Sequence, residues 1–154
     1  NSLSKTYSIP GIRVGWVASN TKVANILRDY RDYTMICAGV FDDMVATLVL
    51  ENKEAILERN RQIIEENLAL MDEWIAKEPK ASWIRPASVS TSFVKLDVDR
   101  PIEVFALELL QEYGVLVVPG NRFDKESHVR IGYCCDKEVL QKGLEKLSQF
   151  LNKC

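Results

Sequence analysis

The sequence predicts an α/β fold in which helices pack on a small mixed or antiparallel sheet. A long stretch from residue 41 to residue 77 repeats apolar residues every three or four positions, which indicates helix. After Pro79 short β-branched and aromatic runs alternate with helical patterns, as expected for a covered sheet. The 154 residues, 47% of them hydrophobic and 27% charged, suffice for a core of ordinary size.

The first forty residues are expected to contain turns, one short strand and one helix. Residues 1–11 are rich in Ser, Pro and Gly, and the weak alternation over 14–17 predicts a strand. Ser19-Asn20-Thr21 provides helix-capping side chains before a helix over residues 22–33. Apolar residues recur on one face of that helix, at Val23, Ile26, Leu27 and Tyr30.

The long pattern over 41–77 exceeds the usual length of a single helix. A break is therefore expected between Leu50 and Lys53. The charged residues lie mostly off the apolar stripe and form a solvated face.

The last part of the chain is expected to hold four strands and two helices. One helix follows Asp99-Arg100-Pro101 and stops at Gly114, and Asp136 is expected to cap the other. The strands are expected at 83–86, 92–97, 115–118 and 128–133. The inner stripe of the last helix comprises Val139, Leu140, Leu144, Leu147, Phe150 and Leu151.

Composition argues against several classes of function. A net charge of −2 gives no electrostatic footprint for nucleic acid. No apolar run approaches the roughly 20 residues that span a bilayer. Four cysteines without a CxxC pair and a single histidine favour reduced thiols in the cytoplasm over a metal site.

The chemistry-bearing residues gather in the first sixteen positions. Ser2-Leu3-Ser4-Lys5 precedes Pro10-Gly11-Ile12-Arg13-Val14-Gly15-Trp16. A lysine amine can bond covalently to an aldehyde as a Schiff base, and serine hydroxyls with a guanidinium suit phosphate oxygens. Glycines let the backbone approach a ligand closely. Pyridoxal 5'-phosphate carries both the aldehyde and the phosphate.

Ser2-Leu3-Ser4-Lys5 also fits the S-x-x-K of serine β-lactamases and penicillin-binding proteins. That chemistry requires S-D-N and K-T-G motifs elsewhere, and the sequence contains neither. The pyridoxal phosphate interpretation also explains the flanking residues and is preferred.

The motif over residues 2–16 resembles the cofactor-lysine signature of class I/II aminotransferases, which are fold-type I pyridoxal phosphate enzymes. The resemblance implies that Lys5 forms the imine with the cofactor and then moves the substrate proton. It places Ser2 and Arg13 at the phosphate, with Ser4 close by.

The resemblance continues along the tail. Residues 114–120, Phe123 and residues 129–133 look like the small-domain ending of the same family. There a strand arginine receives the substrate α-carboxylate, and the matching residue is Arg130. A guanidinium can clamp a carboxylate with two hydrogen bonds, which fixes the substrate for proton removal. His128 is expected to pack or lie at the surface.

The resemblance also implies a domain organisation. Residues 1–40 would be a remnant of the large cofactor-binding domain, 41–79 a connecting helix, and 80–154 the small domain. The groups that hold the cofactor ring would then precede residue 1. The chain is expected to be the C-terminal part of a homodimeric cytoplasmic enzyme, inactive by itself, acting on amino acids and 2-keto acids.

Two other functions remain open at this point. A carbon–sulfur β-lyase of the same fold would use the same Lys5 but expel a group from Cβ. A non-catalytic assembly domain would need no cofactor. The substrate side chain is not defined, because Arg130 would read only the carboxylate common to all amino acids, and Arg28 and Arg31 look solvated.

Overall fold

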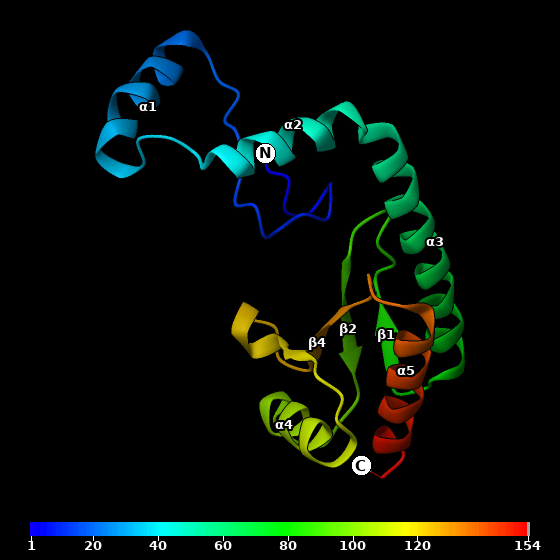
Figure 1. Cartoon of the computed structure of the whole chain (residues 1–154). Helices are drawn as coiled ribbons and strands as arrows, with labels where there is room; N and C mark the ends of the chain where they lie inside the picture. Colours follow the sequence, from blue (N-terminus) through cyan, green and yellow to red (C-terminus); the bar gives the residue numbers. More distant parts are fainter. Residues whose placement is uncertain (154) are drawn as a thin grey trace. The chain divides into compact units, whose positions relative to one another are not determined.

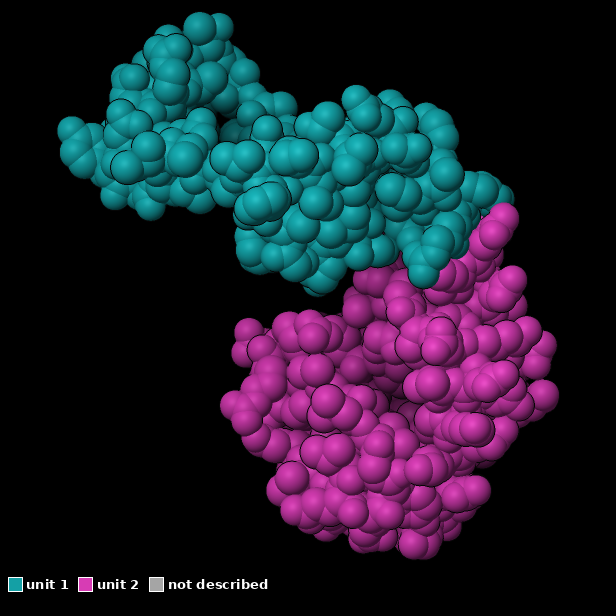
Figure 2. Space-filling view, viewed as in Figure 1, with its two compact units in different colours: residues 1–61 teal, residues 62–154 magenta. Residues whose placement is uncertain are grey.

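The computed structural model describes residues 1–153 and divides the chain into two compact units, residues 1–61 and residues 62–154 (Figure 2). Figure 1 labels the main helices and strands. In chain order the elements are α1 (Thr21–Thr34), α2 (Val40–Glu51), α3 (Lys53–Lys77), β1 (Ala81–Trp83), β2 (Thr91–Leu96), α4 (Ile102–Tyr113), β3 (Val118–Pro119), the 3-10 helix η1 (Gly120–Phe123), β4 (His128–Gly132) and α5 (Lys137–Leu151). The predicted α/β class with a small sheet is confirmed. The division at 1–40, 41–79 and 80–154 stays a prediction.

Helix α1 begins where the capping residues predict. The Asn20 side chain accepts a hydrogen bond from the Val23 amide at 3.0 Å, which satisfies one of the free donors of the first turn. No residue of α1 is buried, and the exposed fractions of Ile26 and Leu27 are 47% and 46%. The apolar face of this helix is therefore open in the part of the chain that the structure describes.

Asn52 separates α2 from α3, within the predicted interval. Its side-chain Nδ2 donates to the Leu48 carbonyl at 2.8 Å, and its own carbonyl accepts from the Ile56 amide at 3.4 Å. The residue thus ends one helix and opens the next.

The strand predicted over 14–17 is wrong. Only Gly15 pairs, through a single antiparallel bridge to Ser2, and Val17 is 70% exposed. Two backbone amides donate hydrogen bonds across this pairing. The Leu3 amide donates to the Val14 carbonyl, and the Trp16 amide donates to the Asn1 carbonyl at 2.8 Å. The pairing is therefore too short to form a regular strand.

Unit 2 is built on a four-stranded antiparallel sheet in the order β1-β2-β4-β3. Alternation along β2 and β4 buries one face, with Val94 and Val129 fully enclosed. Phe93 and Arg130 lie opposite each other on the other face. Helices α3, α4 and α5 contribute to the single core of this unit, and Figure 1 shows α3 and α5 beside the sheet.

The termini of these elements differ from prediction at two strands. The strand expected at 83–86 is β1, which ends at Trp83, because Ile84 is 94% exposed and Arg85 turns to pair with Asp72 of α3 at 2.8 Å. The strand expected at 115–118 is reduced to Val118, which continues into Pro119.

Helices α4 and α5 follow their predicted ranges. Gly114 ends α4 in the left-handed region at φ 67°, which costs glycine little. Along α5, Leu140, Leu144, Leu147, Phe150 and Leu151 are buried as predicted. Val139 is 59% exposed, so its assignment to the inner stripe is wrong. It lies in the first turn of the helix and lines a surface groove.

A partly buried chain of polar contacts ties α3 to α5. Trp74 Nε1 donates to Ser148 Oγ at 2.8 Å, and Ser148 Oγ donates to Glu78 Oε2 at 2.6 Å. Only 5% of Glu78 is exposed, so these bonds compensate a carboxyl group withdrawn from water.

Over residues 1–153, no helix combines the length and apolar character needed to cross a membrane.

Candidate functional site

The segment that carries Lys5 is held by backbone pairing and one buried side chain. The Leu3 amide donates to the Val14 carbonyl, and the Ile9 amide donates to the Leu3 carbonyl, both at 3.1 Å. Leu3 is fully buried against Ala46 and Val49 of α2. The loop is therefore anchored at its centre by an apolar contact.

The burial of Leu3 decides where its neighbours lie. Ser2 and Ser4 are half-buried on either side of it, and Lys5 is exposed. The two hydroxyls and the amine therefore remain accessible to a ligand while Leu3 fastens the backbone between them.

Arg13 returns to this group from the other side of the loop. Its NH1 donates to the Pro10 carbonyl at 2.8 Å and lies 3.5 Å from Ser4 Oγ, at the outer limit of hydrogen bonding. The residue has a φ of 48°, which is uncommon for a side chain of this size. Backbone strain of this kind persists where the surrounding structure imposes it, often at functional sites.

The donor set fits an anion. Among residues 1–153 neither Lys5 nor Arg13 has a carboxylate within ion-pairing distance, and Gly11 leaves open space where a side chain would lie. Two hydroxyls, a guanidinium and an amine without acidic neighbours suit a phosphate and an aldehyde. The structure thus places Arg13 beside Ser4, with Ser2 and Lys5 in the same loop, and the cofactor-binding roles of all four stay predictions.

Arg130 lies in unit 2, on the sheet face away from the core. Its guanidinium carbon is 5.1 Å from the centre of the Phe123 ring, and Phe93 meets Phe123 edge to face at 5.3 Å. No ion pair of Arg130 occurs in the described part of the chain. A half-buried guanidinium that packs against an aromatic ring and has no acidic partner can bind a carboxylate.

His128 and Phe123 complete the surroundings of Arg130. His128 is half-buried, tilted against Phe93 at 6.1 Å, and its Nδ1 lies 2.8 Å from the Glu126 carbonyl. It thus packs at the edge of the sheet, as expected. Sequence reasoning missed the contact between Phe123 and Arg130, because the two are seven positions apart and meet only through the 3-10 helix η1.

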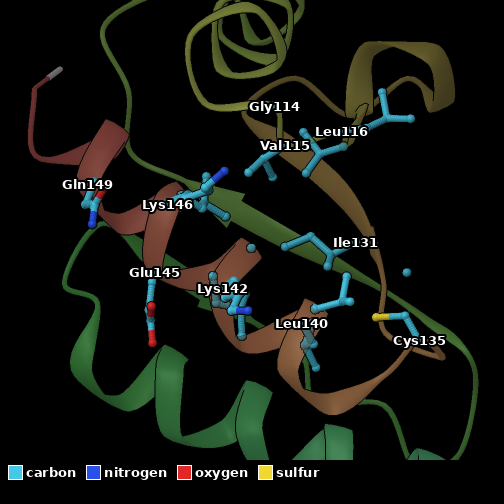
Figure 3. Close-up of a pocket in the computed structure, with 16 residues that line it drawn as sticks. Gly114, Val115, Leu116, Ile131, Cys135, Leu140, Lys142, Glu145, Lys146 and Gln149 are labelled. Atoms are coloured by element: carbon cyan, nitrogen blue, oxygen red, sulfur yellow. The ribbon is translucent and has the colours of Figure 1, made fainter.

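A groove of about 550 Å³ opens in unit 2 between residues 114–117 and α5. Figure 3 shows Val115, Ile131 and Leu140 around this space. None of the five predicted site residues lines it, although Ile131 and Gly132 follow Arg130 directly in β4. The groove is therefore separate from the predicted cofactor and carboxylate groups.

Sequence reasoning also missed two asparagines that hold these segments. Asn60 Nδ2 donates to the Thr6 carbonyl at 3.0 Å, next to Lys5. Asn67 Nδ2 donates to the carbonyls of Tyr133 and Cys135 at 2.7 and 2.8 Å, just after β4. The available signal was the position of Asn67 within the apolar stripe of a long helix, where a polar side chain requires a buried partner.

Comparisons with known proteins find related sequences along nearly the whole chain. A sequence profile of the family described as aminotransferase class I and II matches residues 1–147. Capreomycidine synthase of Streptomyces vinaceus is 30% identical over 151 residues, covering 97% of this chain and 39% of that protein. The probable N-acetyl-LL-diaminopimelate aminotransferase of Bacillus subtilis (strain 168) is 26% identical over 162 residues, covering 99% and 39%.

Solved structures extend the similarity. A PLP-dependent aminotransferase from Streptococcus suis 89-1591 is 68% identical with a TM-score of 0.97, covering 99% of this chain and 41% of that one. Aspartate aminotransferase of Thermotoga maritima is 28% identical with a TM-score of 0.86, covering 99% and 39%. The chain thus spans about two fifths of the length of these relatives. Because the family profile matches nearly all of its residues, the chain belongs to the class I and II aminotransferases.

Proposed function

We propose that the chain is the C-terminal part of a pyridoxal phosphate-dependent aminotransferase that moves an amino group between an amino acid and a 2-keto acid. The observation that carries the proposal is the group formed by Ser2, Ser4, Lys5 and Arg13 without an acidic neighbour in the described residues. The 68% identity to the PLP-dependent aminotransferase of Streptococcus suis supports it.

Ser2, Ser4 and Arg13 would bind the phosphate of the cofactor, and the Lys5 amine would hold its aldehyde end. When bound, pyridoxal phosphate supplies an electron-accepting ring conjugated to the amino group of the substrate. Lys5 Nζ would take the proton from Cα of the amino acid as a general base and later give it up as a general acid. Arg130 would bind the α-carboxylate of the amino acid through its guanidinium fork, with Phe123 restricting the movement of the guanidinium.

The test is a panel of amino donors with 2-oxoglutarate, assayed on the full-length protein that the source gene encodes. Lys5→Ala should abolish amino transfer, and Lys22→Ala, which removes an exposed lysine of α1, should leave it unchanged. Arg130→Lys keeps the charge but loses the fork, so KM for the amino donor should rise about tenfold or more. An active Lys5→Ala variant would refute the assignment. The 154-residue chain by itself is proposed to be inactive.

A second candidate reaction follows from the relatives. Capreomycidine synthase and a PLP-dependent cyclase, the latter 27% identical with a TM-score of 0.90, share the same segments. A β-lyase or a cyclase would use Lys5 for the same proton removal. Stoichiometric conversion of 2-oxoglutarate to glutamate supports the aminotransferase. Release of pyruvate or of a cyclised product without a keto-acid acceptor would favour the alternatives.

We further propose that the whole enzyme is a cytoplasmic homodimer. The exposed apolar side chains of unit 1, including Ile36 at 77% and Phe41 at 83%, are typical of a surface that another part of a protein covers. The free thiols of Cys37, Cys134 and Cys135 suit a reducing compartment. Light scattering of the full-length protein measures the oligomeric state, and a monomeric mass would contradict the dimer.

A further inference from the structure

The backbone immediately after Lys5 forms a tight turn. The Ser8 amide donates to the Lys5 carbonyl at 3.2 Å, and Ser8 lies in the left-handed region at φ 58°. The Lys5 carbonyl is thus used inside the turn. The next carbonyl, that of Thr6, instead accepts a hydrogen bond from Asn60 of α3.

Asn60 is itself oriented by its neighbour. Arg59 NH1 donates to Asn60 Oδ1 at 3.1 Å, which leaves Nδ2 to face Thr6 at 3.0 Å. The two partners are 54 residues apart in the chain, so the bond is a tertiary contact. Asn60 is half-buried and Thr6 is exposed, so the bond lies at the surface of the molecule.

Lys5 is thereby held on both sides. Two residues earlier, Leu3 is buried against α2, and one residue later Thr6 is bonded to α3. Leu3 holds the loop to the surface, and Tyr7 and Ile9 pack against the same apolar cluster. The hydrogen bond to Asn60 adds a polar contact from α3 at the residue directly after Lys5.

We propose that Asn60 is a positioning residue for Lys5, which fixes the turn that carries the amine and is kept in its orientation by Arg59. The inference rests on the proposed function, in which Lys5 must reach both an aldehyde and a Cα proton. A small displacement of a reacting group lowers the rate of the chemical step more than it weakens substrate binding.

The test compares variants in the full-length protein loaded with pyridoxal phosphate. Asn60→Ala and the isosteric Asn60→Asp both remove the donor, and kcat should fall about fivefold while KM changes less than about twofold. Asn60→Gln retains the donor and should recover part of the rate. Asn52→Ala is the matched control, because it removes a similar side-chain bond to the Leu48 carbonyl at 2.8 Å, away from Lys5.

A second measurement requires no activity. Amide hydrogen exchange of the protein without cofactor should show the Ser8 and Ile9 amides exchanging about fivefold faster in Asn60→Ala, and unchanged in Asn52→Ala. Wild-type exchange and wild-type kcat in both Asn60 variants would overturn the proposal, as would an equal fall of kcat in Asn52→Ala. If the full-length protein transfers no amino group, the proposed function fails, and faster exchange confined to the Asn60 variants still supports the control of this turn.

Discussion

Replacing Asn67 with alanine should destabilise unit 2 more than most substitutions of a single polar residue do. The side chain is 1% exposed and donates to the Tyr133 carbonyl at 2.7 Å and to the Cys135 carbonyl at 2.8 Å. The first carbonyl is buried and would lose its partner at a cost of about 1–3 kcal/mol. The second is partly exposed and should cost about 0.5–1.5 kcal/mol, because water can replace the amide.

Alanine is the better helix former, which offsets about 0.5 kcal/mol within α3. The Asn67→Ala change should therefore lower the free energy of unfolding by about 1–4 kcal/mol. Urea unfolding followed by tryptophan fluorescence measures the loss, with Asn52→Ala, a more exposed asparagine, as the control. A loss below about 1 kcal/mol would show that these carbonyls find other partners and would refute the reasoning.

The isosteric Asn67→Asp variant adds a pH dependence. A carboxylate facing two carbonyls would be disfavoured by burial and repulsion, so the pKa of the new carboxyl should be raised in the folded state. Its stability should then be greatest at acidic pH, below the ordinary value for Asp, and decrease as the pH rises through the folded pKa. A variant equally stable at pH 4 and pH 7 would contradict this assignment.

Three further changes test other parts of the structure. Ser148→Ala breaks the chain of polar contacts from Trp74 to the buried Glu78 and should cost about 1–3 kcal/mol of unfolding free energy; a urea midpoint equal to wild type would argue against these contacts. Burial raises the pKa of Tyr133 above its ordinary 10.0, so the unfolded chain ionises first. The contribution of Tyr133 to the free energy of unfolding should be fully present below pH 10 and decline above it. Tyr133→Phe should remove that decline in unfolding curves taken at several pH values. Gly15→Val would place a Cβ 2.8 Å from the Asn1 carbonyl and should accelerate exchange of the Leu3 amide, whereas unchanged protection would show that the pairing can adjust.

The helices were predictable because their ends carry local signals. Asn20 caps α1 with its own side chain, and Gly114 stops α4 with a backbone conformation that glycine favours. The strands were less predictable, because pairing partners determine how far a strand extends. Val115 and Val117 have strong β-propensity, yet β3 includes only Val118 and Pro119.

The candidate site shows the same division between local and tertiary information. Lys5, Arg13 and Arg130 could be selected from the sequence, because their side chains carry the chemistry and stand in a recognisable motif. Asn60 carries no such signal, because its importance depends on a carbonyl group 54 residues away. Asn67 stands within an apolar stripe, which indicates a buried polar side chain, but only the fold identifies its partner 66 residues away.

The position of Leu3 between two serines limits how this segment can change in length. Only Ser4 separates the buried Leu3 from Lys5, and the chain bends over these three residues before the turn that begins at Lys5. Inserting or deleting one residue there would leave Leu3 against Ala46 and Val49 but would shift the amine relative to that fixed point. Substitutions at the serines alter single contacts, whereas a change of one residue in spacing would displace the amine from the whole group.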